Sequence, residues 1–459
     1  MEVAVGARMA ASILTLLFLA SWCLMSASGF RQRGMEREEE EEAHGGGRRL
    51  RGRFLLARAT TVARTDAGEI RVASRYPSKS EPCPMHIGFI QMEPNSLVVP
   101  QYIDANLVLF VHTGEVKVGW IHKDELVERK MRRGDVNVIP AGSTFYIVNT
   151  HRGDRSQMIC SIDTTQSMGV SLHQSFFVGG GMNPTSVLAG FDSNTLAAAF
   201  NVTAEELERM MRSQSGGAIV YMRGESTERP DIDDDNDDGA WTKQKLVDYL
   251  LGKVDRKKAG NGEHVGALHS YNLYDNEPSY RNSFGWTTAI DEDDYSPLRS
   301  TGVGVYVVNL TAGSMLAPHM NPMATEYGVV LRGSGTIQVV FPNGSNAMNA
   351  EVSEGDAFWI PQYFPFCQIA SSGAPMEFFG FTTSSRRNHP QFLVGASSVL
   401  RSMRGPELAA AFRVSEERLE RLVKAQRESV ILPVRHHQLP EEEDEAEEEL
   451  SKLKRGVFA

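Results

Sequence analysis

Cysteine is rare in this sequence and does not occur in a number that allows full pairing. Only four of the 459 residues are cysteines, and Cys23 lies in an apolar stretch near the N-terminus. The other three, Cys83, Cys160 and Cys367, leave at least one thiol over in any compartment where disulfides form. If Cys367 has another role, Cys83 and Cys160 are the pair to expect.

Basic charge is also in deficit. The 47 lysines and arginines are outnumbered by 58 acidic residues, which gives a net charge of −11 and an isoelectric point near 5.6. Binding to phosphate backbones needs a basic surface, which this chain lacks on average. The composition therefore argues against a nucleic acid as partner, and it argues against docking to a membrane.

Long apolar runs are missing except for one, residues 9–25. Arg8 precedes this run and the small residues 26–29 follow it, which is the layout of a signal peptide over residues 1–29. A bilayer span needs about 20 apolar residues, so a retained membrane anchor is the weaker alternative. The segment is left out of the fold prediction.

Three strongly charged segments divide the rest of the chain. They are residues 30–71, residues 227–264 and residues 437–459. Such segments bury too little apolar surface to offset their chain entropy, so we predict two disordered linkers and an acidic tail. The domains between them are residues 72–226 and residues 265–436. A calcium loop is the alternative for the aspartate run 231–238, but the Gly and the distal Glu of such a loop are absent.

The two domains repeat each other. Residues 196–209 read LAAAFNVTAEELER and residues 408–421 read LAAAFRVSEERLER. Each stretch predicts helical sequence with an apolar stripe and a cap at Thr203 or Ser415. The stripes are Leu196, Phe200 and Leu207 in the first repeat, and Leu408, Phe412, Leu419 and Leu422 in the second. Before the helices, short β-branched runs between Gly, Pro and Asn turns predict a barrel or jelly roll.

The second domain carries two spaced motifs. The first contains Gly313, His319, Asn321, Glu326 and Gly333, and the second contains Gly355, Pro361 and Cys367. His319 and Asn321 are two apart on one strand and face the same side, as paired metal ligands must. A thiolate with one imidazole favours copper or zinc, so His319, Cys367, Asn321 and Glu326 form a candidate metal site. Alternatively, His319 is a hydrogen-bonded core residue and Cys367 is a small buried apolar one.

The first domain has lost this set. When the domains are aligned on Gly114, the positions of Gly313, His319, Asn321 and Glu326 are taken by Pro94, Pro100, Tyr102 and Leu107. A metal-dependent barrel with these motifs would carry a third histidine in the second motif, and that position falls on Phe366 in the second domain and on Phe145 in the first. This set of side chains cannot hold a metal, so we expect the first barrel to serve a structural role only.

Together the motifs resemble those of the vicilin-like seed storage globulins of the cupin superfamily. The similarity covers residues 72–433 and includes the runs 84–89, 174–181, 341–344, 365–368 and 387–391. It implies a mainly β fold of two cupin barrels, which are jelly-roll β-barrels, each followed by a small α-helical arm. It also implies a homotrimer held by the arms. The alternative for the arms is that each stripe packs only on its own barrel.

The resemblance implies a nutrient reservoir without catalysis and without a required cofactor. Only 14 Gln and 18 Asn are present, an ordinary proportion, which suggests a minor rather than a bulk reserve. One alternative is a protein that binds a metal or a small anion in the second barrel. Another is a cupin oxidase, dioxygenase or isomerase, although a redox metal held by one imidazole would be weakly retained.

Three Asn-X-Ser/Thr triplets, at Asn201, Asn309 and Asn343, fit passage through the secretory pathway. The terminal residues 456–459 are similar to the short apolar tails that direct such globulins to vacuoles. We therefore expect a protein of the storage vacuole or of the cell exterior.

Overall fold

A computed structural model describes residues 53–56, 58–74, 85–151, 153–164, 167, 174–222 and 270–434. The chain divides into a unit from Met1 to Arg53 and a compact unit from Phe54 to Ala459, and the second unit contains nearly all the described residues. The predicted signal peptide, the linker 227–264, the acidic tail and Cys83 lie outside them. None of the helices in the described part of the chain is long and apolar enough to cross a membrane.

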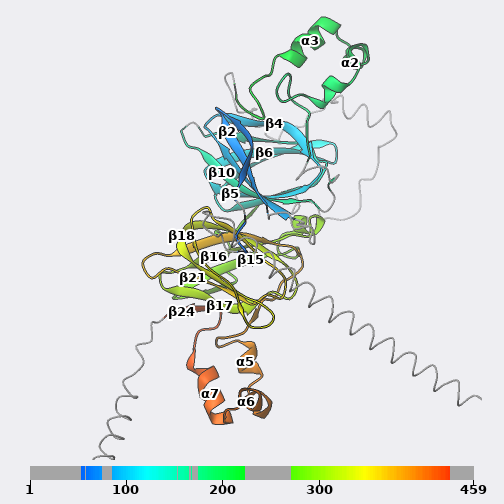
Figure 1. Cartoon of the computed structure of the whole chain (residues 1–459). Helices are drawn as coiled ribbons and strands as arrows, with labels where there is room; N and C mark the ends of the chain where they lie inside the picture. The colour runs from blue at the N-terminus through cyan, green and yellow to red at the C-terminus, as the bar shows by residue number, and fades with distance from the viewer. Residues whose placement is uncertain are drawn as a thin grey trace, which may run out of the picture. The chain divides into compact units, whose positions relative to one another are not determined.

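The first barrel is built from two antiparallel sheets that face each other (Figure 1). One sheet has the order β1 (Thr60–Thr65), β2 (Gly68–Ala73), β3 (Met85–Met92), β10 (Ser156–Asp163), β5 (Asn106–Thr113), β8 (Asp135–Ile139) and β13 (Tyr271–Asn272). The other has the order β11 (Ser175–Phe177), β4 (Ser96–Ile103), β9 (Phe145–Asn149), β6 (Glu115–His122) and β7 (Glu125–Arg132), with β12 (Ile219–Tyr221) on β4. Apolar side chains from both sheets fill the interior, as the alternating strands predict.

The barrel begins earlier than the sequence predicts. We expected residues 30–71 to be a disordered linker, but β1 and most of β2 fall within that range; β1 pairs with β2, and β2 pairs with β3. Most of the side chains of β1 are exposed, so its sequence lacks the apolar alternation that marks a strand. Backbone pairing to β2 places it in the sheet, and the first barrel starts at Thr60 rather than at residue 72.

The second barrel is one continuous sheet that curls on itself. Its order is β14 (Tyr280–Asn282), β15 (Gly285–Ile290), β16 (Gly304–Leu310), β22 (Met376–Thr382), β18 (Glu326–Val340), β21 (Phe366–Ala370), β17 (Ser314–Met320) and β23 (Gln391–Phe392). β19 (Asn346–Ser353) and β20 (Ala357–Ile360) pair with β18, and β24 (Ile431–Pro433) pairs with β17. The mainly β fold of two jelly-roll barrels is confirmed.

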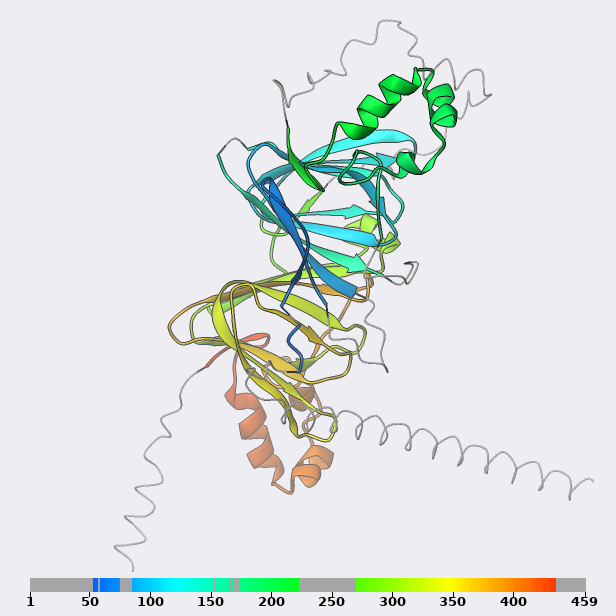
Figure 2. The same cartoon turned by 45° about the horizontal axis from the view of Figure 1, so that its top comes forward.

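A helical arm follows each barrel (Figures 1 and 2). The first arm contains α2 (Ser193–Phe200) and α3 (Ala204–Arg212), and the second contains α5 (Val399–Ser402), α6 (Pro406–Phe412) and α7 (Glu416–Ala425). Both predicted caps are present: Thr203 Oγ1 accepts from the amide of Glu206 at 3.2 Å, and Ser415 Oγ accepts from that of Arg418 at 3.3 Å. Short 3₁₀ turns lie at Val187–Gly190 and Ser296–Ser300.

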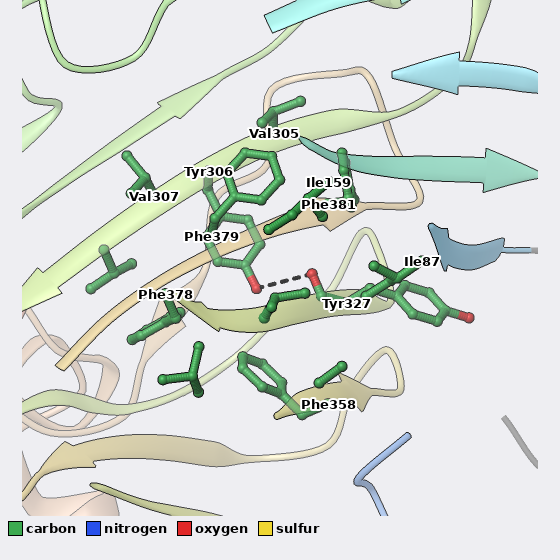
Figure 3. Close-up of a cluster of buried hydrophobic side chains, with 14 of the residues drawn as sticks. Ile87, Ile159, Val305, Tyr306, Val307, Tyr327, Phe358, Phe378, Phe379 and Phe381 are labelled. Carbon is green, nitrogen blue, oxygen red and sulfur yellow. Dashed lines mark hydrogen bonds between the residues drawn. The ribbon is translucent and has the colours of Figure 1, made fainter. Parts of the chain in front are cut away.

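Apolar residues from both barrels form one buried cluster. The rings of Phe110 in β5 and Phe379 in β22 stack with their centroids 3.9 Å apart. Figure 3 shows Ile87 and Ile159, from β3 and β10, drawn in the same cluster as Phe379 and Phe381. The interior of the second barrel continues from this cluster through Tyr306, Phe358 and Phe378.

Candidate functional site in the second barrel

Three of the four predicted ligand residues are buried at the β17–β18 connection of the second barrel. His319 is near the end of β17, Asn321 follows that strand, and Glu326 is the first residue of β18. All three side chains are buried, with exposed fractions of 2%, 2% and 6%. Of these three side chains, those of Asn321 and Glu326 are in direct contact.

Both polar atoms of the Asn321 amide make hydrogen bonds within the protein. Its Nδ2 donates to Glu326 Oε1 at 3.0 Å, and its Oδ1 accepts from the backbone amides of Met323 and Ala324, each at 3.2 Å. An amide oxygen that already accepts two backbone hydrogen bonds is a poor metal ligand. Asn321 therefore shapes the loop and holds Glu326 in place.

His319 is neutral at physiological pH. Its Nδ1 lies 2.7 Å from the carbonyl oxygen of Ala317, so the proton is on Nδ1 and the lone pair is on Nε2. The ring packs on Phe366 and Phe392, with centroids 4.1 and 5.3 Å away. Burial lowers the pKa of His319 to about 4, and the hydrogen bond to Ala317 offsets only part of that effect.

Glu326 keeps its proton to an unusually high pH. Burial raises the pKa of its carboxyl group to about 7, although hydrogen bonds with Asn321 and Tyr306 lower it. Tyr306, in β16, has a pKa well above its usual range because of burial and because of the carboxylate beside it. The barrel therefore contains a neutral imidazole, a phenol and a carboxyl group that is partly protonated near neutral pH.

Cys367 points away from this group. In β21 it follows Phe366, which lies directly opposite His319 on β17 and whose ring touches the imidazole. Successive strand residues face opposite sides of a sheet, so the thiol lies on the other face, 3.8 Å from Gln338 Oε1. Burial raises its pKa to about 11. Within the described residues, His, Cys, Asp and Glu side chains form no group of three or more that could hold a metal ion.

Strand register corrects the equivalent positions in the first barrel. Gln101 lies opposite Phe145 just as His319 lies opposite Phe366, and an irregularity precedes each residue on its strand. Ile103 accepts a backbone hydrogen bond from Gly142 as Asn321 does from Tyr363. The three interior positions are thus Gln101, Ile103 and Leu107. The predicted Pro100 and Tyr102 are each one residue out of register, but the conclusion that no metal ligand remains is unchanged.

Two interior polar residues escaped the sequence analysis. The Tyr306 hydroxyl donates to the carbonyl oxygen of Tyr327 at 3.5 Å (Figure 3), and Tyr306 is the only polar side chain in the apolar run 303–308, which is a usable signal. Gln368 is 1% exposed, and neither polar atom of its side chain has a partner among the described residues. It is two residues beyond Phe366 and faces the same side of β21.

Cys160, the partner proposed for Cys83, is a buried free thiol in β10. Its sulfur occupies the space where a Cβ at Gly88 would lie, and burial raises its pKa to about 12. Cys160 thus packs as a small apolar core residue. Its expected pairing with Cys83, which lies outside the described residues, stays a prediction.

Comparison with known proteins gives consistent matches over both barrels. The sequence profile of the cupin family, described as Cupin, matches residues 56–208 and 271–420. A vicilin-like seed storage protein of Arabidopsis thaliana is 49% identical over 419 residues, which are 84% of this chain and 81% of the relative. The crystal structure of vicilin from hazelnut, Corylus avellana, has a TM-score of 0.69 and 22% identity and covers 83% of this chain and 99% of its own. Tomato vicilin, from Solanum lycopersicum, has the same TM-score at 20% identity, with coverages of 83% and 99%.

Proposed function

The chain belongs to the cupin family, as one of its vicilin-like seed storage proteins, and from this premise we propose how it serves as a reserve. Its function is that of a nutrient reservoir. In our proposal it accumulates as a homotrimer in the storage vacuole after passing through the secretory pathway. It has no catalytic turnover and requires no cofactor. The signal peptide at residues 1–29 and the apolar tail at residues 456–459 support this route.

The main support for the proposal is that most of the metal-ligand positions inside the two barrels hold side chains that do not bind a metal ion. Gln101, Ile103 and Leu107 occupy the interior positions of the first barrel, and two of them are apolar. In the second barrel the oxygen of Asn321 is committed to backbone amides, and Phe366 fills the place of a third imidazole. A redox or Lewis-acid metal needs several ligands to be retained and tuned. The barrel fold is thus retained, although most of the residues that would form a reactive metal centre are replaced.

A metal site in the second barrel stays a prediction. His319 Nε2 and the Glu326 carboxylate are the donors that a copper or zinc ion would meet there. The residues as they stand do not fit such an ion well, because Asn321 is engaged and Cys367 faces the other side of its strand. A metal bound through Cys367 would require β21 to shift its register by one residue.

One experiment tests both parts of the proposal. Protein purified without chelator or metal-binding tag is sized by light scattering and analysed for metals in the same sample. We expect a mass three times that of the protomer and copper and zinc contents far below one per chain. One copper or zinc ion per chain that is lost in the His319→Ala variant and in the Cys367→Ala variant would contradict the proposal that the second barrel binds no metal. A monomer at micromolar concentration would contradict the assembly.

A further inference from the structure

The three Asn-X-Ser/Thr triplets differ sharply in their surroundings. An oligosaccharide on an asparagine needs a side-chain nitrogen that faces solvent and room for a bulky polar group beside it. The structure describes Asn201, Asn309 and Asn343 together with their flanking residues. It therefore distinguishes between triplets that the sequence alone leaves equal.

Asn309 lies in the middle of a sheet. It is on β16, between Trp286 on β15 and Glu377 on β22. Its Nδ2 donates to Glu377 Oε2 at 3.4 Å, and Thr311 donates to the carbonyl oxygen of Phe284. A sugar on Nδ2 would separate this asparagine from Glu377 and would have to fit between neighbouring strands. The native fold is incompatible with a glycan there.

Asn201 is exposed but lies on the first helical arm. It ends α2 in a left-handed conformation with φ 55°, and its neighbours Phe200 and Val202 are 48% and 37% exposed. Thr203, the third residue of the triplet, accepts the capping hydrogen bond of α3. This apolar surface is the one proposed to contact another subunit. A glycan at Asn201 would cover it with a hydrophilic chain.

Asn343 lies at the tip of the β18–β19 hairpin, where residues 342–346 are all exposed. Its Oδ1 accepts from the Ser345 hydroxyl at 2.7 Å and from the Ser345 amide at 3.0 Å, which fixes the orientation of the carboxamide. Its Nδ2 has no hydrogen-bond partner in the described part of the chain. A Cβ built on Gly344 would meet nothing within 4 Å, so the space around the tip is open.

We propose that Asn343 is the N-glycosylation site of this protein and that Asn201 and Asn309 remain unmodified in the assembled molecule. The inference rests on the proposed passage through the secretory pathway. The co-substrate is a lipid diphosphate oligosaccharide. Nδ2 of Asn343 forms a bond to C1 of the first sugar, the bond from C1 to the diphosphate oxygen breaks, and the lipid diphosphate leaves with that electron pair. A base of the transferase takes one proton from Nδ2.

The test uses the full chain expressed in a plant or yeast secretory host, with its own leader and, in parallel, with an established secretion leader in place of residues 1–29. Purified protein is treated with peptide N-glycosidase, and the peptides around each triplet are analysed by mass spectrometry. The enzyme converts a glycosylated Asn to Asp, so each site is read directly. Asn343→Gln and Ser345→Ala are the test variants, and Asn201→Gln and Asn309→Gln are their matched controls.

We expect one glycan per chain, at Asn343, which both test variants lose and both control variants keep. An unglycosylated chain behind the established leader, or a glycan at Asn201 or Asn309 in the assembled protein, would overturn the inference. Failure of the natural leader alone, with normal glycosylation behind the other leader, would count against the secretory route and not against Asn343. Ser345→Ala also serves where Asn343→Gln alters the turn, because it keeps the asparagine and removes only the hydroxyl.

Discussion

Two buried residues of the second barrel give its stability opposite dependences on pH. Glu326 has a pKa of about 7 against its ordinary value of 4.5, so its folded form keeps a proton that the unfolded chain releases. Its contribution is fully present below pH 4.5 and is lost as pH rises through 7. His319 has a pKa of about 4 against 6.5, so its contribution is present above pH 6.5 and is lost as pH falls through 4. Between pH 4.5 and 6.5 the two slopes cancel.

Replacing Glu326 by Gln removes one of these slopes. We expect the free energy of unfolding of Glu326→Gln, minus that of the natural chain, to rise by about 3 kcal/mol from pH 4.5 to 7, since one pKa unit corresponds to about 1.4 kcal/mol. Urea titrations at a series of pH values measure this difference. Glu351→Gln, which removes an exposed carboxyl group from β19, is the control. A difference that does not vary with pH would show that the Glu326 carboxyl group ionises normally.

At this scale, the sequence prediction of the first-barrel positions equivalent to His319 and Asn321 is wrong by one residue of strand register. The alignment on Gly114 assigned Pro100 to the place of His319, but strand pairing gives Gln101. The connection that follows spans residues 104–106 in the first barrel and residues 322–325 in the second. A loop length is not fixed by residue type, so spacing alone misplaces the residues on its far side. Likewise Cys367 was the right kind of ligand on the wrong face of its strand.

At the scale of the strand, glycines make room for large aromatic rings. A Cβ on Gly380 in β22 would lie 2.3 Å from the carbonyl oxygen of Tyr327 and 2.4 Å from Cζ of Tyr306. Gly328 stands in the same relation to the ring of Phe358, and Gly119 to that of Tyr146. Both neighbours of Gly380 are held by the sheet, so neither can easily give way.

We therefore expect Gly380→Ala to lower the free energy of unfolding by about 1–3 kcal/mol, the usual cost of overpacking a core. Gly373→Ala is the matched control, because nothing lies within 4 Å of its added Cβ, and it should change stability by less than about 0.5 kcal/mol. Urea denaturation followed by tryptophan fluorescence measures both. Equal stabilities of the two variants would mean that β22 moves to accommodate the methyl group.

Strands and helices with a clear apolar pattern or a capping residue were predictable from the sequence, whereas the strands β1 and β2, which lack such a pattern, were not. The barrels follow from strand alternation and turn residues, and Thr203 and Ser415 cap their helices as expected. β1 and β2 were assigned to a linker because charged and polar residues dominate that stretch. Their place in the sheet comes from pairing with each other and from the pairing of β2 with β3, and such backbone pairing overrides local preference.

At the scale of the whole molecule, the two arms repeat in exposure as well as in sequence. Leu207 and its equivalent Leu419 are buried, at 4% and 5% exposed. Phe200 and its equivalent Phe412 are 48% and 57% exposed, and the equivalent pair Met210 and Leu422 is 47% and 62% exposed. In each arm, one part of the apolar stripe is thus buried within the protomer and the other part is exposed. Two similar but distinct apolar surfaces on one chain suit a head-to-tail contact that closes into a ring.

The outward-facing phenylalanines are the residues on which such a ring would depend. We expect the double variant Phe200→Asp and Phe412→Asp to sediment as a folded monomer at concentrations where the natural chain, in our proposal, is a trimer. Burial of a Phe side chain stabilises a contact by about 1.5–3 kcal/mol, and an unpaired carboxylate in its place adds a desolvation cost. Val62→Asp is the control, since Val62 is 52% exposed on β1, outside the arms. If the double variant remained a trimer and the Val62 variant dissociated, the subunit contact would lie on the barrels, and the arms would serve only their own protomer.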